Sequence, residues 1–127
     1  MSDPDTNLWR AASRAATTLQ LSPPVAVRRA PLSIVALTHG DLVIEFLYAP
    51  PEWHVELLLT YQPDPTIRIG LPELVRDATI RDWMDSHRPT SPITIDAEIE
   101  WFTKLLLEPC ADVLRQPAKF FARFTSQ

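Results

Sequence analysis

The chain has 127 residues, of which 46% are hydrophobic and one is a cysteine, and its formal net charge is −4. This length is the common size of one domain and allows a substantial core without cross-links, so we expect a single domain over residues 1–127. The lone Cys110 excludes an internal disulfide and a cysteine-rich zinc site, and the acidic balance argues against nucleic-acid binding.

The N-terminal part predicts one helix followed by a short strand. Apolar residues at helical spacing indicate a helix over residues 7–20, whose start Asp5 or Thr6 can cap. These apolar residues are Leu8, Ala12, Ala15 and Leu19. Pro23-Pro24 ends the helix, and residues 25–29 form a predicted strand whose place in the sheet the sequence leaves open.

The middle of the chain predicts a meander of three or four antiparallel strands. Residues 32–38 and 42–48 are rich in β-forming side chains and surround His39-Gly40, a two-residue hairpin signal. Residues 53–62 and 66–69 are the next predicted strands, each after a turn that contains proline.

Alternation of side chains suggests a register for each hairpin. The predicted cross-strand pairs are Leu37–Leu42, Val35–Ile44, Phe46–Val55, Ile44–Leu57, Tyr61–Ile67 and Leu59–Ile69. Together they place one apolar set on the same face, which should pack on the helices: Val35, Leu37, Leu42, Ile44, Phe46, Tyr48, Val55, Leu57, Leu59, Tyr61, Ile67 and Ile69. The second face is mixed and carries Val43, Glu45, Leu47, His54, Glu56, Leu58, Thr60 and Arg68.

The C-terminal half predicts two to three helices. The first runs from Pro72 to about Met84, and the second starts near Thr94 or Asp96. The predicted buried stripe of the second helix is Ile95, Ile99, Phe102, Leu105, Leu106 and Val113. Pro109 must end or kink that helix, and residues 118–124 form a last short one. The predicted fold class is therefore α+β, with the C-terminal helices packed on one sheet face.

The second sheet face contains the candidate chemical cluster. In the predicted register Glu45 lies opposite Glu56, and Leu47 lies opposite His54. Like charges opposite each other are destabilising, so such a pair could raise a carboxylate pKa or hold a cation together with His54. Alternatively, the two carboxylates point apart into water or share a cation such as Arg68.

An acidic segment and an adjacent tryptophan indicate a partner-binding surface. Between Arg29 and Arg68 there is no Lys or Arg but there are five acidic residues, a formal charge of −5. Trp53 follows Glu52 in a predicted turn, where an exposed indole is a typical interface anchor. The predicted partner-binding residues are Glu45, Glu52, Trp53, His54 and Glu56. A merely solvated acidic face, and an indole that completes the core, remain the alternatives.

No catalytic, metal or cofactor motif is found. Two glycines are too few for a dinucleotide-binding or P-loop motif, and neither HExxH nor G-x-S-x-G occurs. We therefore predict no catalytic residue, no metal and no cofactor, and a buried, inert thiol at Cys110. The acidic N-terminus does not look like a signal peptide, and no apolar stretch approaches the ~20 residues of a membrane helix. We expect a cytoplasmic protein that binds no membrane.

The layout resembles small bacterial α+β immunity proteins of polymorphic toxin systems. The similar features are an N-terminal helix, a meander with Glu45 and the run Glu52-Trp53-His54-Val55-Glu56, and an amphipathic helix ending in residues 105–114. The resemblance implies a protein that neutralises a toxin by binding it. The leading hypothesis is thus a non-enzymatic protein-binding module, an immunity-like inhibitor of a basic toxin.

Two other functions stay open. One is a homodimeric structural or adaptor subunit, joined through Val43, Leu47 and Leu58 on the second sheet face. The other is a small-ligand or metal-binding protein that uses the same face, through the carboxylates and the histidine of the candidate cluster.

Overall fold

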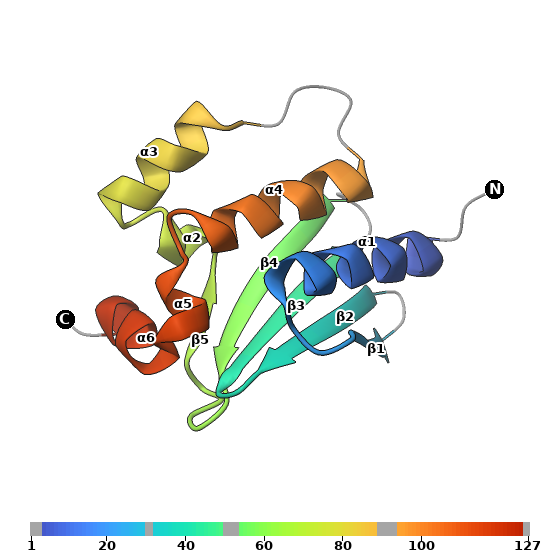
Figure 1. The fold of residues 1–127 in the computed structure, drawn as a ribbon, viewed down its shortest axis with the longest axis horizontal. Helices are drawn as coiled ribbons and strands as arrows, with labels where there is room; N and C mark the ends of the chain where they lie inside the picture. Colours follow the sequence, from blue (N-terminus) through green and yellow to red (C-terminus); the bar gives the residue numbers. More distant parts are fainter. Residues whose placement is uncertain (1–3, 30–31, 50–53, 89–93, 126–127) are drawn as a thin grey trace.

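The computed structural model describes residues 4–29, 32–49, 54–88 and 94–125. A first helix precedes five strands, and the other described helices follow them (Figure 1), which confirms the predicted α+β class. The elements are α1 (Pro4–Leu19), β1 (Val25–Arg29), β2 (Leu32–His39), β3 (Leu42–Ala49), β4 (His54–Tyr61), β5 (Arg68–Gly70), α2 (Leu71–Leu74), α3 (Ala78–Ser86), α4 (Ile95–Leu107), α5 (Asp112–Arg115) and α6 (Pro117–Thr125).

The strands form one antiparallel sheet in the order β1-β2-β3-β4-β5, a meander in which each strand pairs with its neighbour in sequence. Residues 25–29 do join the sheet, as an edge strand paired with β2. The described sheet therefore has five strands instead of the three or four predicted. Helices α1 and α4 lie side by side across one face of it (Figure 1).

One predicted register is confirmed and two are wrong by two residues. In the β4–β5 pair Leu59 lies opposite Ile69, as predicted. In the first hairpin Leu37 lies opposite Ile44, because pairing continues to His39 and Leu42. The two-residue loop is therefore Gly40-Asp41, with Gly40 at a φ of 58°, where the lack of a Cβ avoids strain.

The second hairpin is shifted in the same way. Phe46 lies opposite Leu57, where Val55 was predicted, and the pairing runs as far as Ala49 and His54. Because side chains alternate with a period of two, a two-residue shift leaves every side chain on its predicted face. The two errors therefore change the cross-strand neighbours but not the division of the sheet into two faces.

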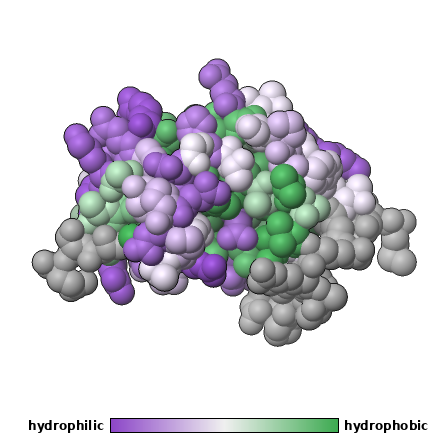
Figure 2. Space-filling view, turned by 90° about the horizontal axis from the view of Figure 1, so that it is seen from below, coloured by the Kyte–Doolittle hydropathy of each residue, from purple (hydrophilic) through white to green (hydrophobic). Residues whose placement is uncertain are grey.

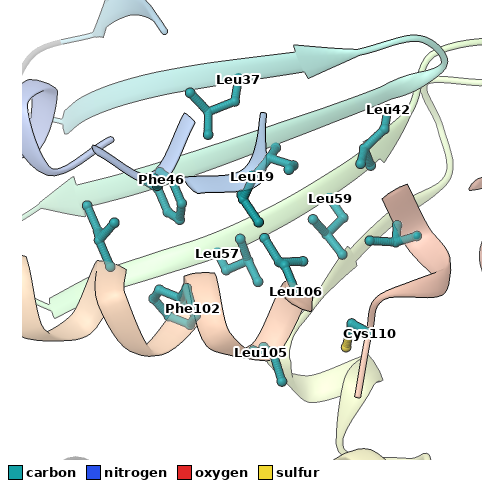
Figure 3. Packing of buried hydrophobic residues seen from close by; sticks show 14 of the residues in the cluster. Leu19, Leu37, Leu42, Phe46, Leu57, Leu59, Phe102, Leu105, Leu106 and Cys110 are labelled. Atoms are coloured by element: carbon teal, nitrogen blue, oxygen red, sulfur yellow. The ribbon is translucent and has the colours of Figure 1, made fainter. Parts of the chain in front are cut away.

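The predicted apolar face packs against the helices and forms the core. Of its twelve side chains, Tyr48, Tyr61 and Ile67 are partly buried and the rest are buried. Figure 3 shows Phe46 and Leu57 facing Phe102 of α4, with Leu19 of α1 beside them. Each fully buried Leu or Phe stabilises the fold by about 1.5–3 kcal/mol, so this layer contributes strongly to the hydrophobic driving force.

The helix boundaries correct two predictions. Helix α1 begins at Pro4, so Asp5 and Thr6 lie inside its first turn and do not precede it as caps. The helix predicted from Pro72 to Met84 is two helices, α2 and α3. The cause of the break is Asp77, whose carboxylate accepts hydrogen bonds from the Thr79 and Ile80 backbone N–H groups and so starts a new helix.

The C-terminal helices follow their sequence signals closely. Thr94 caps α4 by accepting a hydrogen bond from the Ala97 N–H at 3.1 Å. The helix ends at Leu107, before Pro109, as proline requires. Val113 is buried but belongs to α5, so the prediction that it extends the stripe of the same helix is wrong.

Candidate functional site

The face of the sheet opposite the helices is called the outer face here. It comprises the described side chains of Val25, Val27, Ile34, Ala36, Thr38, Val43, Glu45, Leu47, His54, Glu56, Leu58, Thr60 and Arg68. Ile34 and Ala36 are buried, yet they are separate from the core cluster that the helices share with the other face. Within the described ranges no helix packs across the outer face, and α4 reaches only His54 at the start of β4.

The outer face is more apolar than an uncovered antiparallel sheet normally is. Such sheets usually alternate apolar residues toward the core with polar residues toward water. Here Val43, Leu47 and Leu58 are only partly buried, and Val25 on the edge strand is 59% exposed. On the side of the molecule that is seen from below in Figure 2, hydrophobic green patches also lie beside hydrophilic purple ones. Contiguous apolar surface rimmed by polar groups is typical of a protein-binding site.

Glu45 lies in the middle of this apolar surface. Its cross-strand neighbours are Ala36 on β2 and Leu58 on β4, and its side chain is partly buried. The predicted direct pairing of Glu45 with Glu56 is wrong, because Glu56 lies opposite Leu47 in the observed register. The two glutamates are diagonal neighbours on one face, at a typical spacing of about 7–8 Å. The structure thus keeps them close but not in contact.

Neither carboxylate is neutralised by the described part of the chain. Among those residues, Glu45 and Glu56 form no hydrogen bond and no ion pair. Arg68, the predicted alternative partner, lies opposite Thr60 and donates from Nε to the Pro65 carbonyl oxygen at 3.4 Å. A carboxylate that is partly removed from water without a partner favours the approach of an external cation.

His54 has a different partner from the one predicted. Its Nδ1 lies 3.9 Å from Oε2 of Glu98 on α4, and the same oxygen accepts a hydrogen bond from the Val55 N–H at 3.0 Å. Burial raises the pKa of Glu98, while the Val55 hydrogen bond and the His54 charge oppose that shift. Glu98 therefore ties the start of β4 to α4, and His54 belongs to this contact, not to a Glu45–Glu56 cluster.

Sequence reasoning did not assign a role to Glu98. The sequence showed it only as an acidic residue near the start of a helix, which is favourable for the helix dipole. Its actual contact bridges residues 43 positions apart, and no local pattern encodes such a contact. The other two predicted site residues, Glu52 and Trp53, lie outside the described residues.

Two other tryptophans serve to hold helices together. The Trp83 indole N–H donates to Oε1 of Glu108 at 3.1 Å, and the Trp101 indole N–H donates to the His87 carbonyl oxygen. The Trp83 ring also stacks on the His87 ring at a centroid distance of 4.4 Å. The two hydrogen bonds join α3 to α4, so this part of the tryptophan content is explained by packing.

The described residues contain no group of three or more His, Cys, Asp or Glu side chains that could hold a metal ion. Cys110 is buried, as predicted, and burial raises the pKa of its thiol to about 12. A thiol with this pKa is protonated at neutral pH and is a poor nucleophile.

The chain has no significant match to a protein-family model, to a curated protein or to a solved structure. None of the helices in the described ranges combines the length and the apolar character needed to cross a lipid bilayer.

Proposed function

We propose that this chain is a non-enzymatic protein-binding module that contacts a basic partner through its outer face. The observation that carries the proposal is the pair Glu45 and Glu56, which lie in an apolar surface and have no cationic partner among the described residues. The resemblance to immunity proteins makes a basic toxin the first partner to consider, and a cytoplasmic location fits that role.

The surface favours a cationic partner over a neutral one. Docking would remove the partly buried Glu45 carboxylate from its remaining water, and that step is unfavourable unless a cation replaces the water. An Arg side chain suits the site because its guanidinium group bonds carboxylates bidentately. Its aliphatic stem would pack on side chains such as Leu47 and Leu58. The charge of the two glutamates would select the partner, and the apolar side chains around them would supply most of the buried contact area.

The homodimer is the weaker alternative for the same surface. A two-fold contact places each patch against its own copy, so Glu45 and Glu56 would approach like charges. Among the described side chains of the outer face, Arg68 is the cationic one. Each subunit of a dimer would therefore bring one Arg and two Glu side chains to the contact. Counting these three side chains, the homodimer would bury more negative than positive charge.

The test is an affinity pull-down from host lysate with three tagged proteins. The outer-face variant is E45K/E56K, and the matched control is D82K/D85K, which makes the same change in net charge on the exposed surface of α3. We expect the wild type and the control to recover the same basic protein at low salt and to lose much of it at high salt. The outer-face variant should recover little of it at either salt concentration.

Mass spectrometry identifies the recovered protein, and circular dichroism verifies that both variants remain folded. Equal recovery by the outer-face variant would remove the outer face from the proposal. Recovery of an acidic partner, insensitive to salt, would contradict the choice of a basic one.

A further inference from the structure

A second surface feature lies in the helical layer, on the opposite side of the sheet from the outer face. Helices α1 and α4 run side by side there (Figure 1), and a hollow of about 370 Å³ opens between them. Its lining residues are Ala11, Arg14, Ala15 and Thr18 of α1 and Asp96, Ile99, Glu100, Thr103, Lys104 and Leu107 of α4. The hollow shares no residue with the outer face, so an inference about it is independent of the proposed function.

The hollow exists because small side chains face larger ones. On α1, Ala11 and Ala15 are buried one turn apart and leave space beside the helix. On α4, Ile99 is buried, while Leu107 at the far end is 44% exposed. A small molecule in this space would therefore meet mainly methyl and methylene groups, and its burial there would be favoured by the hydrophobic effect.

The charged groups around the hollow already have partners. Arg14 of α1 lies 3.6 Å from Asp96 of α4, and Lys104 lies 3.6 Å from Glu100 one turn before it. A charged ligand would have to compete with one of these ion pairs, whereas an uncharged ligand leaves both intact. The lining therefore discriminates against charge, even though four charged residues contribute to it.

The lining offers one polar group without a described partner. The Thr103 hydroxyl already donates to the Ile99 carbonyl oxygen at 2.7 Å. The Thr18 hydroxyl is exposed and forms no hydrogen bond within the described part of the chain. It can donate to, or accept from, one polar group of a ligand.

We propose that the hollow between α1 and α4 binds a small uncharged molecule that has an aromatic or branched aliphatic body and one hydroxyl group. Its volume falls in the range of about 300–1,000 Å³ that is typical of small-molecule sites. The apolar body fills the space beside Ala11 and Ala15, and the hydroxyl group bonds to Thr18. The paired charges at the rim set the preference for a neutral ligand.

The test is an NMR titration of the full-length chain with benzyl alcohol, benzoate and benzylammonium, which share a ring and differ in charge. Benzyl alcohol should give saturable shifts confined to the lining, strongest at Ala11, Ala15 and Ile99, with a Kd on the order of 1 mM, the affinity expected of so small a probe. The two charged probes should bind at least about tenfold more weakly, a difference of about 1.4 kcal/mol.

Variants on α1 locate the site. T18W places an indole at the rim of the hollow and should abolish the shifts, while T17W is the matched control. Thr17 is also exposed, and its hydroxyl donates to the Ser13 carbonyl oxygen, so it takes no part in the lining. T18V, which removes only the hydroxyl, should weaken the binding of benzyl alcohol. It should not weaken the binding of toluene, which has no hydroxyl group. L107W is a second way to fill the hollow if T18W disturbs the fold.

The proposal is overturned by any of three results. The first is the absence of saturable shifts in the lining with benzyl alcohol. The second is equal or tighter binding of a charged probe at the same residues. The third is undiminished binding in folded T18W or L107W.

Discussion

The contact between Asp77 and Arg123 makes a strong prediction about stability. Asp77 caps α3, and its second carboxylate oxygen accepts a hydrogen bond from Arg123 of α6, 46 positions away. Arg123 also lies 3.5 Å from Asp112, with its guanidinium group about 5.4 Å from the Phe120 ring centroid. One carboxylate thus stabilises a helix start and links it to the C-terminal helix.

We expect D77A to lower the free energy of unfolding by about 2 kcal/mol. Loss of the cap accounts for roughly 1 kcal/mol. Loss of the ion pair adds up to about 1 kcal/mol, a value limited by water because the Arg123 side chain is 42% exposed. For a chain of this length, the midpoint of thermal unfolding should fall by about 8 °C. D77N keeps a capping oxygen, so it should lose only about half as much.

The pH dependence follows from the charge on the same group. Burial raises the pKa of Asp77, but the hydrogen bonds from Ile80, Arg123 and Thr79 together hold that pKa below its ordinary value of 3.8. A lowered pKa in the folded state means that the stabilisation is present above pH 3.8 and is lost as the pH falls through the folded-state pKa. The difference between wild type and D77N should therefore be constant from pH 5 to 7 and shrink below about pH 4.

Urea unfolding of wild type, D77A, R123A and the double variant at pH 7 measures these effects. The two residues are in contact, so the double-mutant cycle should give a coupling energy of about 0.5–1 kcal/mol. The reasoning would be refuted by a D77A variant as stable as wild type, or by strictly additive effects of the two substitutions.

Two further predictions concern the β4–α4 contact and the first hairpin. E98A should lower the free energy of unfolding by about 1 kcal/mol, because the Val55 N–H loses its hydrogen-bond acceptor. E98Q keeps an acceptor, so it should lower the free energy of unfolding by less at pH 7. Since burial raises the pKa of Glu98 above its ordinary 4.5, wild type should gain stability relative to E98Q as the pH falls toward 4.5, and thermal melts that show the opposite trend would contradict this assignment. G40A should lower the free energy of unfolding by about 1–2 kcal/mol, because a residue with a Cβ is strained at the positive φ of Gly40. A steric clash does not contribute, since the added Cβ meets no atom within 4 Å. G40N should cost less in the same melts, and equal losses would argue against a left-handed turn at this position.

Several features of the fold could be predicted from local sequence patterns. Alternation along the strands assigns Leu37, Phe46 and Leu59 to the buried face, and the structure confirms it. Thr94 and Pro109 bracket α4 as expected, because capping and the missing proline donor act within one helical turn. The β4–β5 register was also predicted correctly, with Leu59 opposite Ile69 on the buried face.

Other features depend on contacts between distant parts of the chain. Pairing in the first hairpin extends to His39 because Gly40 can adopt a positive φ, a choice that alternation alone does not distinguish from the predicted one. Alternation was equally ambiguous for the second hairpin, where Glu56 lies diagonal to Glu45 and not opposite it as predicted. His54 meets Glu98, and α1 meets α4 at the hollow, only once the helices pack on the sheet. Periodicity decides which face a side chain occupies, whereas tertiary packing decides which neighbours it meets there.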